Sequence, residues 1–193
     1  MSISVGKTEL RNNLKKLRTG FSREQVTASS LQVSRNILAC DAYRKAKCIM
    51  GYLAFGNELS VDLVLSQALA DGKFVAVPHI ISSMDMISVH LRNMDDFDLD
   101  RYGIRSIRYP FEKVLPQTLD LILVPGVAFG SDGSRLGMGA GYYDRFLPQA
   151  DKALFMGIAY DQLIQSQLPA DNYDIFMQCL ASESGITTLS RFN

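Results

Sequence analysis

The fold follows from the segment Arg135-Leu136-Gly137-Met138-Gly139-Ala140-Gly141-Tyr142-Tyr143-Asp144-Arg145-Phe146-Leu147, in which three glycines at alternate positions precede two tyrosines, an acid and an arginine. Upstream, the run Asp120-Leu121-Ile122-Leu123-Val124-Pro125 predicts a short buried strand, because an apolar stretch lies between an acid and a proline. Downstream, residues 142–147 predict the start of a helix. Successive N–H groups of the glycine-bearing loop between them can face an anion, since glycine has no Cβ and tolerates positive φ.

The spacing of the glycines narrows the kind of anion site. It matches neither the G-x-G-x-x-G dinucleotide fingerprint nor the G-x-x-x-x-G-K-[ST] phosphate loop. Dehydrogenases and ordinary P-loop enzymes therefore lose support. A flexible surface loop is the alternative interpretation, and the regular spacing followed by Tyr-Tyr-Asp-Arg favours phosphate binding over it.

The rest of the chain alternates predicted helices and strands. Helices are predicted over 7–18, 22–39 and 60–70, with Ser22 and Gln25 as a capping box, Ser60 as an N-cap and Gly72 as a stop. Apolar runs predict strands at 47–54, 73–77 (ended by Pro78), 120–125, 153–159 and 179–182, and a weaker strand at 86–91.

Less regular segments complete the chain. Residues 95–100 predict a solvated acidic loop or turn of helix, 102–116 an irregular segment, and the tail from Gly185 an edge strand. Any helix that follows residue 160 is broken at Leu168-Pro169. The order of elements predicts a layered α/β fold, and we expect one domain over 1–193.

Composition excludes several classes of function. With 193 residues, 47% hydrophobic and 21% charged, the chain fits one soluble globular domain. Equal numbers of acidic and basic residues give no net charge, which argues against nucleic acid as a partner. No apolar run approaches the ~20 residues of a membrane helix, and no signal peptide is predicted. Cys40, Cys48 and Cys179 form no C-x-x-C pair and predict idle thiols in a reducing cytoplasm, and two histidines are too few for a zinc cluster.

The first predicted helix carries two stripes at helical spacing. One stripe is apolar (Leu10, Leu14 and Leu17) and the neighbouring one is basic (Lys7, Arg11, Lys15 and Arg18). Like charges at i, i+4 repel by ~0.2–0.5 kcal/mol per pair, so the basic stripe is either a solvated face or one that faces an anion. The residues alone leave both interpretations open.

Three loops are expected to meet at one crevice, because ligands of open α/β sheets gather beyond the carboxyl ends of the strands. They are 55–60, 126–141 and 160–174, and the last brings Asp161, Asp171 and Asp174. Asp144 suits a Mg²⁺ ligand beside a triphosphate, although capping or pairing with Arg145 is an alternative. Glu58 can orient or deprotonate a substrate nitrogen, or it is a plain solvated acid.

These motifs resemble a known family. Lys7-x-x-Leu10-Arg11, Gly56-Asn57-Glu58 and Gly137-x-Gly139-x-Gly141-Tyr142-Tyr143-Asp144-Arg145-x-Leu147 are similar to the 5-formyltetrahydrofolate cyclo-ligases, also called methenyltetrahydrofolate synthetases. Gly157-Ile158-Ala159-Tyr160, Leu168-Pro169 and Asp174 continue the pattern in order. The resemblance implies a three-layer α/β/α sandwich with a mostly parallel central sheet. It also implies ATP- and Mg²⁺-dependent cyclisation of 5-formyltetrahydrofolate to 5,10-methenyltetrahydrofolate, with release of ADP and phosphate.

The resemblance also implies roles for single residues. The ATP contacts are Lys7, Arg11, Arg135, Leu136, Gly137, Met138, Gly139, Ala140, Gly141, Tyr142 and Tyr143, and the metal ligands are Asp144 and Asp174. The folate contacts are Leu53, Glu58, Met138, Gly139, Ala140, Gly141 and Tyr142. The candidate catalytic residues are Glu58, Tyr142 and Arg145. We expect a cytoplasmic enzyme that acts on small molecules as a monomer or weak homodimer, without a nucleic-acid or membrane partner.

The chain departs from the family pattern at four points, and two alternative functions stay open. Many members carry a basic residue in place of Ala140, a histidine in place of Tyr173, and Glu-Pro in place of Tyr109-Pro110; no tryptophan is present for a pterin wall, which leaves tyrosine and phenylalanine. One alternative is a folate- or nucleotide-binding relative without turnover. The other is a different enzyme on the same layered fold, such as a sugar-phosphate isomerase or CoA-transferase relative.

Overall fold

A central sheet of eight strands organises the molecule. The structure, a computed structural model, describes residues 3–99 and 104–189, with side chains from residue 6 onward. The strand order is β13-β12-β10-β7-β1-β2-β3-β6. In that order the strands are β13 (Gly185–Thr188), β12 (Cys179–Ser182), β10 (Leu154–Ile158), β7 (Leu121–Val124), β1 (Cys48–Met50), β2 (Phe74–Ile80), β3 (Met86–His90) and β6 (Lys113–Val114).

The middle of this sheet is parallel. β12, β10, β7, β1 and β2 pair in parallel, with registers such as Ile49↔Leu121 and Ile49↔Val75 around β1. Antiparallel strands flank them, since β13 pairs with β12 and β3 pairs with β2. The prediction of a mostly parallel central sheet is confirmed, and so is the edge strand from Gly185.

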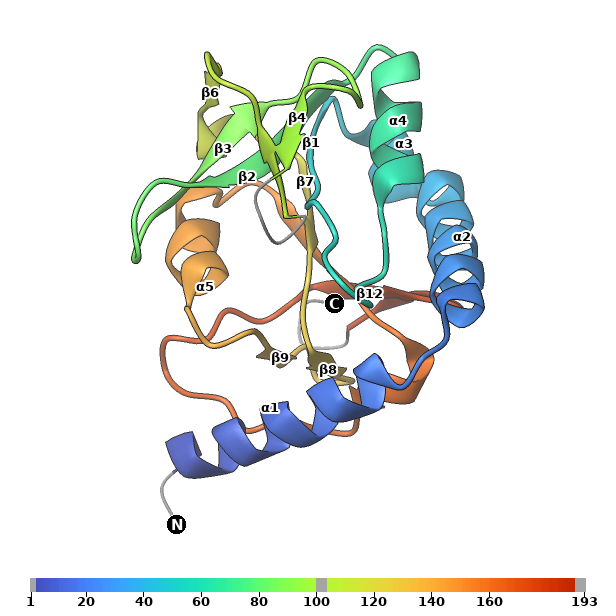
Figure 1. Ribbon diagram of the computed structural model, residues 1–193, viewed down its shortest axis with the longest axis vertical. Helices are drawn as coiled ribbons and strands as arrows, with labels where there is room; N and C mark the ends of the chain where they lie inside the picture. Colours follow the sequence, from blue (N-terminus) through green and yellow to red (C-terminus); the bar gives the residue numbers. More distant parts are fainter. Residues whose placement is uncertain (1–2, 100–103, 190–193) are drawn as a thin grey trace.

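Helices cover both faces of the sheet (Figure 1). On one face lie α2 (Arg23–Ala39), α3 (Asp41–Lys45) and α4 (Asp62–Ala70); on the other lie α5 (Tyr142–Phe146) and the 3₁₀ turn η2 (Leu147–Gln149). The predicted capping box at Ser22 and Gln25 opens α2. Because side chains alternate along a strand, the strands contribute to two separate apolar clusters, one on each face of the sheet.

The central strands show how this alternation builds three layers. In β7, Leu121 and Leu123 pack toward α2 and α4, whereas Ile122 and Val124 pack toward α5. All four side chains are fully buried. Burial of such a side chain stabilises the folded state by about 1.5–3 kcal/mol, so the sheet supplies the core.

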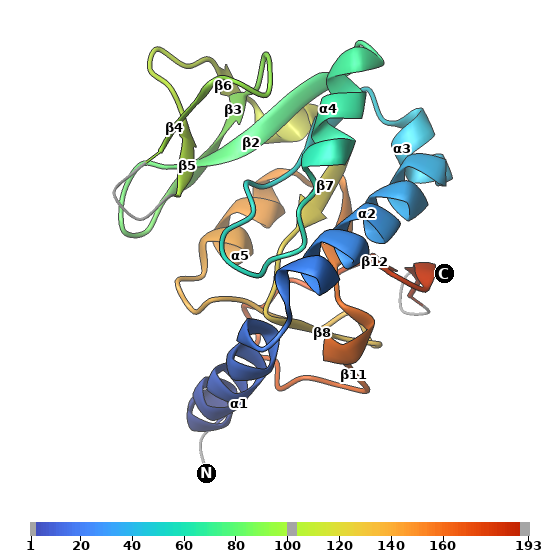
Figure 2. The same ribbon diagram turned by 45° about the vertical axis from the view of Figure 1, so that its right-hand side comes forward.

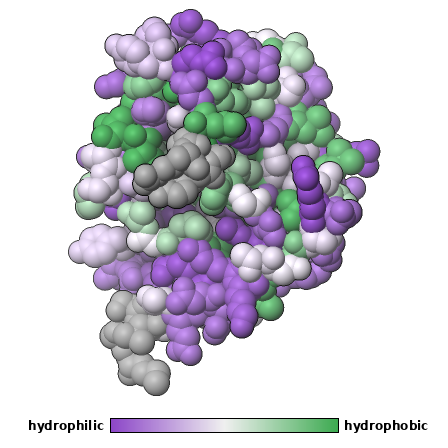
Figure 3. Space-filling model, viewed as in Figure 1, coloured by the Kyte–Doolittle hydropathy of each residue, from purple (hydrophilic) through white to green (hydrophobic). Residues whose placement is uncertain are grey.

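Helix α1 (Ile3–Thr19) lies outside the sandwich, below the carboxyl ends of the central strands and beside β8 in both views (Figures 1 and 2). A small sheet, β11 (Ile164–Gln165), β8 (Ala128–Gly130) and β9 (Arg135–Leu136), lies between them. Glu9, Asn12, Asn13 and Lys16 of α1 are exposed, in keeping with the hydrophilic surface at the lower end of the molecule in Figure 3. Leu14 of the apolar stripe is buried, whereas Leu17 is 59% exposed.

Several predicted boundaries are wrong. The strand predicted over 47–54 ends at Met50, because the apolar residues that follow pack inside a loop instead of a ladder. Ser60 is not the N-cap of α4: the cap position is Val61, and Ser60 Oγ accepts the N–H of Asp62. Pro78 does not end β2, since β1 pairs with β2 only as far as Ala76 and needs no N–H from Pro78.

Two segments predicted as loops are strands. Phe97, within the acidic segment, begins β4 (Phe97–Leu99), which pairs with β5 (Arg105–Ile107). The alternation of Phe97, Asp98 and Leu99 is the period of a strand, and Phe97 packs against the core. The segment predicted as irregular holds β5, β6 and the start of η1 (Pro116–Thr118), while residues 100–103 lie outside the described part. After β10 the chain forms only a 3₁₀ turn, η3 (Asp161–Leu163), before Leu168-Pro169.

No helix in the described part of the chain is both long and apolar enough to span a bilayer.

Candidate active site

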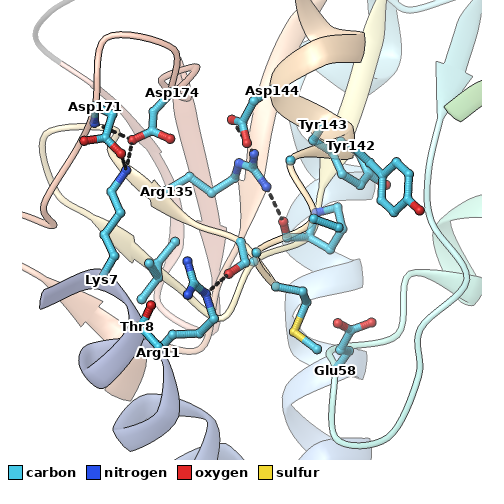
Figure 4. Close-up of a pocket in the computed structure, with 18 residues that line it drawn as sticks. Lys7, Thr8, Arg11, Glu58, Arg135, Tyr142, Tyr143, Asp144, Asp171 and Asp174 are labelled. Atoms are coloured by element: carbon cyan, nitrogen blue, oxygen red, sulfur yellow. Dashed lines mark hydrogen bonds and ion pairs between the residues drawn. The ribbon is translucent and has the colours of Figure 1, made fainter. Parts of the chain in front are cut away.

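A cavity of about 460 Å³ opens at the carboxyl ends of β1 and β7 (Figure 4). β1 pairs with β2 on one side and β7 on the other, and the chain after each strand turns away from its neighbour. Such a switch point leaves a crevice between the two departing loops. The cavity is lined by Lys7, Thr8, Arg11, Glu58, Pro125, Gly126, Arg135, Leu136, Gly137, Met138, Gly139, Ala140, Gly141, Tyr142, Tyr143, Asp144, Asp171 and Asp174.

The glycine loop 137–141 forms one wall. Gly139 and Gly141 have φ of 106° and 69°, conformations that a residue with a Cβ adopts only with strain. The loop is held through its carbonyl oxygens: Arg11 Nε donates to Gly137 O at 2.8 Å, and Arg145 Nη2 donates to Ala140 O at 2.9 Å. No backbone N–H of 137–141 donates to any residue that the structure describes. The donors of this loop are therefore free for a ligand.

Helix α1 brings basic side chains to the opposite wall. Lys7 is buried, and its Nζ donates to Asp171 Oδ2 at 2.7 Å and to Asp174 Oδ2. Burial lowers the pKa of Lys7, but the hydrogen bonds to the two carboxylates outweigh it and raise the pKa above its ordinary value. Lys7 is thus a fixed positive charge in the cavity, and the basic stripe faces the protein instead of solvent.

Arg135 and Asp144 form the second ion pair of the cavity. Arg135 Nη2 donates to Asp144 Oδ1 at 2.6 Å, and the N–H of Ile175 donates to the same oxygen at 3.3 Å. Arg135 Nε is buried without a partner among the described residues. The alternative pairing of Asp144 with Arg145 is wrong, because Arg145 instead donates to the carbonyl oxygens of Ala140 and Met84.

Glu58 enters from the loop after β1. Its Oε2 accepts the N–H of Phe55 at 3.1 Å, and its Oε1 lies 3.6 Å from Arg18 Nη2. Burial raises the pKa of Glu58 above its ordinary value, against the opposing effects of the Phe55 hydrogen bond and Arg18. The interpretation of Glu58 as a plain solvated acid is therefore wrong.

The neighbouring residues explain why this loop is rigid. Asn57 Nδ2 donates to the carbonyl oxygens of Arg18, Thr19 and Phe21 and so joins the loop to the end of α1. Tyr52 Oη donates to Leu59 O at 2.5 Å. The Gly56-Asn57-Glu58 motif thus positions Glu58 through bonds made by the residue before it.

Most predicted site residues meet in this cavity, and their roles stay predictions. The predicted ATP and metal residues all line it, as do Glu58 and Tyr142. Leu53 does not; it packs against the apolar core. Arg145 lines a shallower hollow beside Asn172 and Tyr173. Asp161 lies away from the cavity and accepts a hydrogen bond from Ser184 Oγ.

Thr8, Pro125 and Arg18 were not expected at the site, whereas Gly126 begins the loop 126–141 that was expected there. Thr8 follows the assigned Lys7 and Pro125 directly precedes that loop, and only the local backbone path brings them to the cavity. Arg18 ends the basic stripe of α1, so its spacing from Lys7, Arg11 and Lys15 was the available signal.

The carboxylates of the cavity could hold a hard cation, although they do not form a preformed metal-binding cage. Among residues 3–99 and 104–189 there is no cluster of three or more His, Cys, Asp or Glu side chains in metal-binding geometry. Asp144, Asp171 and Asp174 nevertheless line one wall together (Figure 4). Mg²⁺ accepts such a donor set, because it uses one or two carboxylates and takes its other ligands from water and phosphate.

The fold is a layered α/β sandwich, and free backbone N–H donors and ion pairs lie at the switch point of its sheet. These features define the class of α/β enzymes that bind an anionic substrate beyond the strand ends. Comparison with known proteins narrows the class. The sequence model described as the 5-formyltetrahydrofolate cyclo-ligase family matches residues 3–182. The chain belongs to the 5-formyltetrahydrofolate cyclo-ligase family, and its predicted membership is confirmed.

Individual relatives agree with this assignment. A probable 5-formyltetrahydrofolate cyclo-ligase of Caenorhabditis elegans is 31% identical, with 90% of this chain and 91% of the relative covered. The 5-formyltetrahydrofolate cyclo-ligase of Mus musculus is 28% identical, with 91% and 92% covered. The solved structure of Aquifex aeolicus 5,10-methenyltetrahydrofolate synthetase superposes with a TM-score of 0.84 at 29% identity and covers 95% of this chain and 93% of its own. The isomerase or CoA-transferase alternative is therefore set aside.

Proposed function

We propose that this chain catalyses the ATP-dependent cyclisation of 5-formyltetrahydrofolate to 5,10-methenyltetrahydrofolate, with release of ADP and phosphate. Family membership supports the reaction class. The observation that supports ATP as co-substrate is the glycine loop 137–141. The N–H groups of its five residues make no hydrogen bond to a described residue, and the loop lines the same cavity as Lys7, Arg11 and Arg135. Such a set of donors and cations suits a polyphosphate.

The chemistry explains why a nucleoside triphosphate is needed. A formamide carbon is a poor electrophile, and its oxygen is a very poor leaving group. Transfer of the γ-phosphoryl group to the formyl oxygen makes that oxygen part of a phosphate. Nitrogen-10 then attacks the formyl carbon, its proton leaves, and the carbon–oxygen bond breaks with release of phosphate. The protein has mainly to position both substrates and neutralise phosphoryl charge.

We assign the residues to two ligands that share the cavity. Lys7, Arg11 and residues 135–143 contact ATP. Glu58 and the loop 138–142 contact the folate, and Glu58 accepts hydrogen bonds or the proton from its nitrogens. Leu53, which lies outside the cavity, is not assigned to either ligand. Arg145 acts by holding Ala140 O, and thus the loop, in place.

We assign Mg²⁺ to Asp144 and Asp174. The support is the charge balance: among the described residues three basic side chains (Lys7, Arg11 and Arg135) and four carboxylates (Glu58, Asp144, Asp171 and Asp174) line the cavity, which leaves an excess of one negative charge. A triphosphate would be repelled by that excess unless a divalent cation accompanied it. The ion would supply charge neutralisation at the transferring phosphoryl group.

The remaining assignments concern the cellular setting. We propose a cytoplasmic monomer or weak homodimer that acts on small molecules, without a nucleic-acid or membrane partner. The support is the neutral formal charge and the three free cysteines, which suit a reducing compartment.

The test is turnover of the purified chain with ATP, Mg²⁺ and 5-formyltetrahydrofolate, followed through the methenyl chromophore and phosphate release. Asp144→Asn should lower kcat by about 10²–10³, the usual effect of losing one charge-stabilising group. The matched control is Asp151→Asn, an exposed acid of the same region, which should leave turnover unchanged. Saturable folate or ATP binding without phosphate release would instead identify a binding protein without turnover.

A further inference from the structure

Arg18 is a buried arginine that lies behind Glu58. Only 7% of the residue is exposed, and its Nη1 donates to Gly126 O at 3.1 Å. Its Nη2 lies 3.6 Å from Glu58 Oε1. Two polar contacts, to the loop after β7 and to the loop after β1, therefore fix the guanidinium between the two loops of the switch point.

Arg18 is placed where a substrate cannot reach it. It does not line the large cavity, whereas Glu58 does. It lines a hollow of only about 10 Å³ on the far side, together with Tyr52, Glu58 and Tyr160. That volume holds one water molecule at most. Any effect of Arg18 on the reaction must therefore pass through Glu58.

The surroundings of Glu58 leave Arg18 as its main counter-charge. From α1 it is faced by Arg18 and, further away, by Lys15; from other elements it is faced by the hydroxyl groups of Tyr52, Tyr143 and Tyr160. Burial raises the pKa of all three tyrosines, that of Tyr160 to about 12, so these groups are neutral at physiological pH. Of the groups that face Glu58, only Arg18 lies within ion-pair distance.

We propose that Arg18 is a positioning residue for Glu58, which it keeps ionised and directed into the large cavity. The geometry supplies both parts of this role: an ion pair from the side away from substrate, and a second bond to Gly126 O that fixes the guanidinium. An ionised carboxylate only accepts hydrogen bonds, so Glu58 in this state can receive N–H groups or a proton from the folate. The inference rests on the proposed function.

The sign of the effect follows from the contacts. Burial raises the pKa of Glu58, and Arg18 opposes that rise. Loss of Arg18 should raise the pKa further, so a larger fraction of Glu58 is protonated at a given pH. A protonated Glu58 cannot act as the acceptor. Activity should therefore be lost first at low pH and recovered as the pH increases.

The test compares pH profiles of kcat/KM for wild type, Arg18→Met and Arg18→Lys between pH 5 and 9. Arg18→Met should move the acid limb upward by about 1–3 pH units, the usual influence of an arginine on a neighbouring carboxyl. Arg18→Lys, which keeps the charge, should restore most of the shift. In a Glu58→Gln background, Arg18→Met should no longer move the limb.

The matched control is Arg105→Met. Arg105 makes a two-point ion pair with Asp62, at 2.8 and 2.9 Å, and neither residue lines the cavity. It should leave the acid limb in place. If Arg18→Met does not fold, Arg18→Gln, which keeps a donor for Gly126 O without the charge, replaces it and should show the same upward shift.

The outcomes separate this inference from the proposed function. An inactive wild type refutes the proposed function; calorimetric binding of 5-formyltetrahydrofolate at pH 6 and 8 then tests Arg18 alone, and the variant should lose affinity mainly at pH 6. If the wild type is active, superimposable pH profiles of wild type and Arg18→Met would overturn the inference. If it is inactive, an equal loss of folate binding by the variant at both pH values would overturn it.

Discussion

The central sheet and helix α1 contribute to the same cavity but are held in the molecule by different forces. β1 and β7 consist of apolar residues that are almost completely buried on both faces. α1 buries Leu14 in the core but is attached largely by polar groups: Lys7 to two carboxylates, Arg11 to Gly137 O, and Arg18 to Gly126 O and Glu58. The sheet thus determines the fold, and α1 completes the site.

This difference separates stability from function. Apolar burial in the sheet scales with area and is supported by every neighbouring strand. The apolar contacts of α1 are few, and its attachment relies more on ion pairs and hydrogen bonds, of which the ion pairs weaken with salt. Changes in the sheet should therefore unfold the protein, whereas changes on α1 should release one helix.

The largest effect is expected in the sheet. Leu123→Ala removes a fully buried side chain from β7 and should lower the free energy of unfolding by about 2–5 kcal/mol in urea titrations. Leu17→Ala removes a leucine of the same size from the exposed face of α1 and should change it by less than about 0.5 kcal/mol. Equal effects of the two substitutions would abolish the distinction between the two regions.

A smaller and more local effect is expected on α1. Lys7→Met breaks the contacts with Asp171 and Asp174 and should reduce the protection of α1 amides in hydrogen exchange by about 1.5–3 kcal/mol. Protection of the β7 amides should not change. Lys16→Met, an exposed lysine of the same helix, is the control. Loss of protection in β7 would show that α1 and the sheet unfold together.

The smallest expected effect concerns the reactivity of the cysteines, which reports how well the sheet excludes solvent. Burial raises the pKa of Cys48 to about 11 and that of Cys179 to about 12, so near pH 8 both are almost entirely thiols. Cys40 lies half-buried at the end of α2. An aromatic disulfide reagent should label one thiol rapidly in the folded protein and three in denaturant, and Cys40→Ser should remove the rapid reaction. Rapid labelling of two thiols would contradict this.

The sequence predicted what depends on local pattern. The apolar runs around Leu121, Leu154 and Cys179 have the length of buried strands, and the glycine spacing located the loop. The end of β1 could not be predicted, because the apolar run continues past Met50 through Tyr52, Leu53 and Ala54. At Gly51 a Cβ would lie 2.5 Å from Leu65 Cδ2, so the chain leaves the sheet pressed against α4.

The ion-pair partners of the charged side chains also could not be predicted from the sequence. The pairing of Arg135 with Asp144 and that of Lys7 with Asp171 and Asp174 join segments that only the fold brings together. The acids of 160–174 illustrate this, since Asp171 and Asp174 reach the cavity and Asp161 does not. Spacing indicated which side chains were candidates, and the tertiary structure selected among them.

The two ion pairs of the cavity have a consequence for how an anion arrives. Lys7 is ion-paired with Asp174 and Arg135 with Asp144. These carboxylates offset the repulsion between the two cations, so that both can line the cavity before any ligand binds. An incoming phosphate must then compete with Asp174 and Asp144 for the same donors. The aspartates thus occupy the cations until a ligand arrives, and phosphate binding exchanges one anionic partner of Lys7 and Arg135 for another.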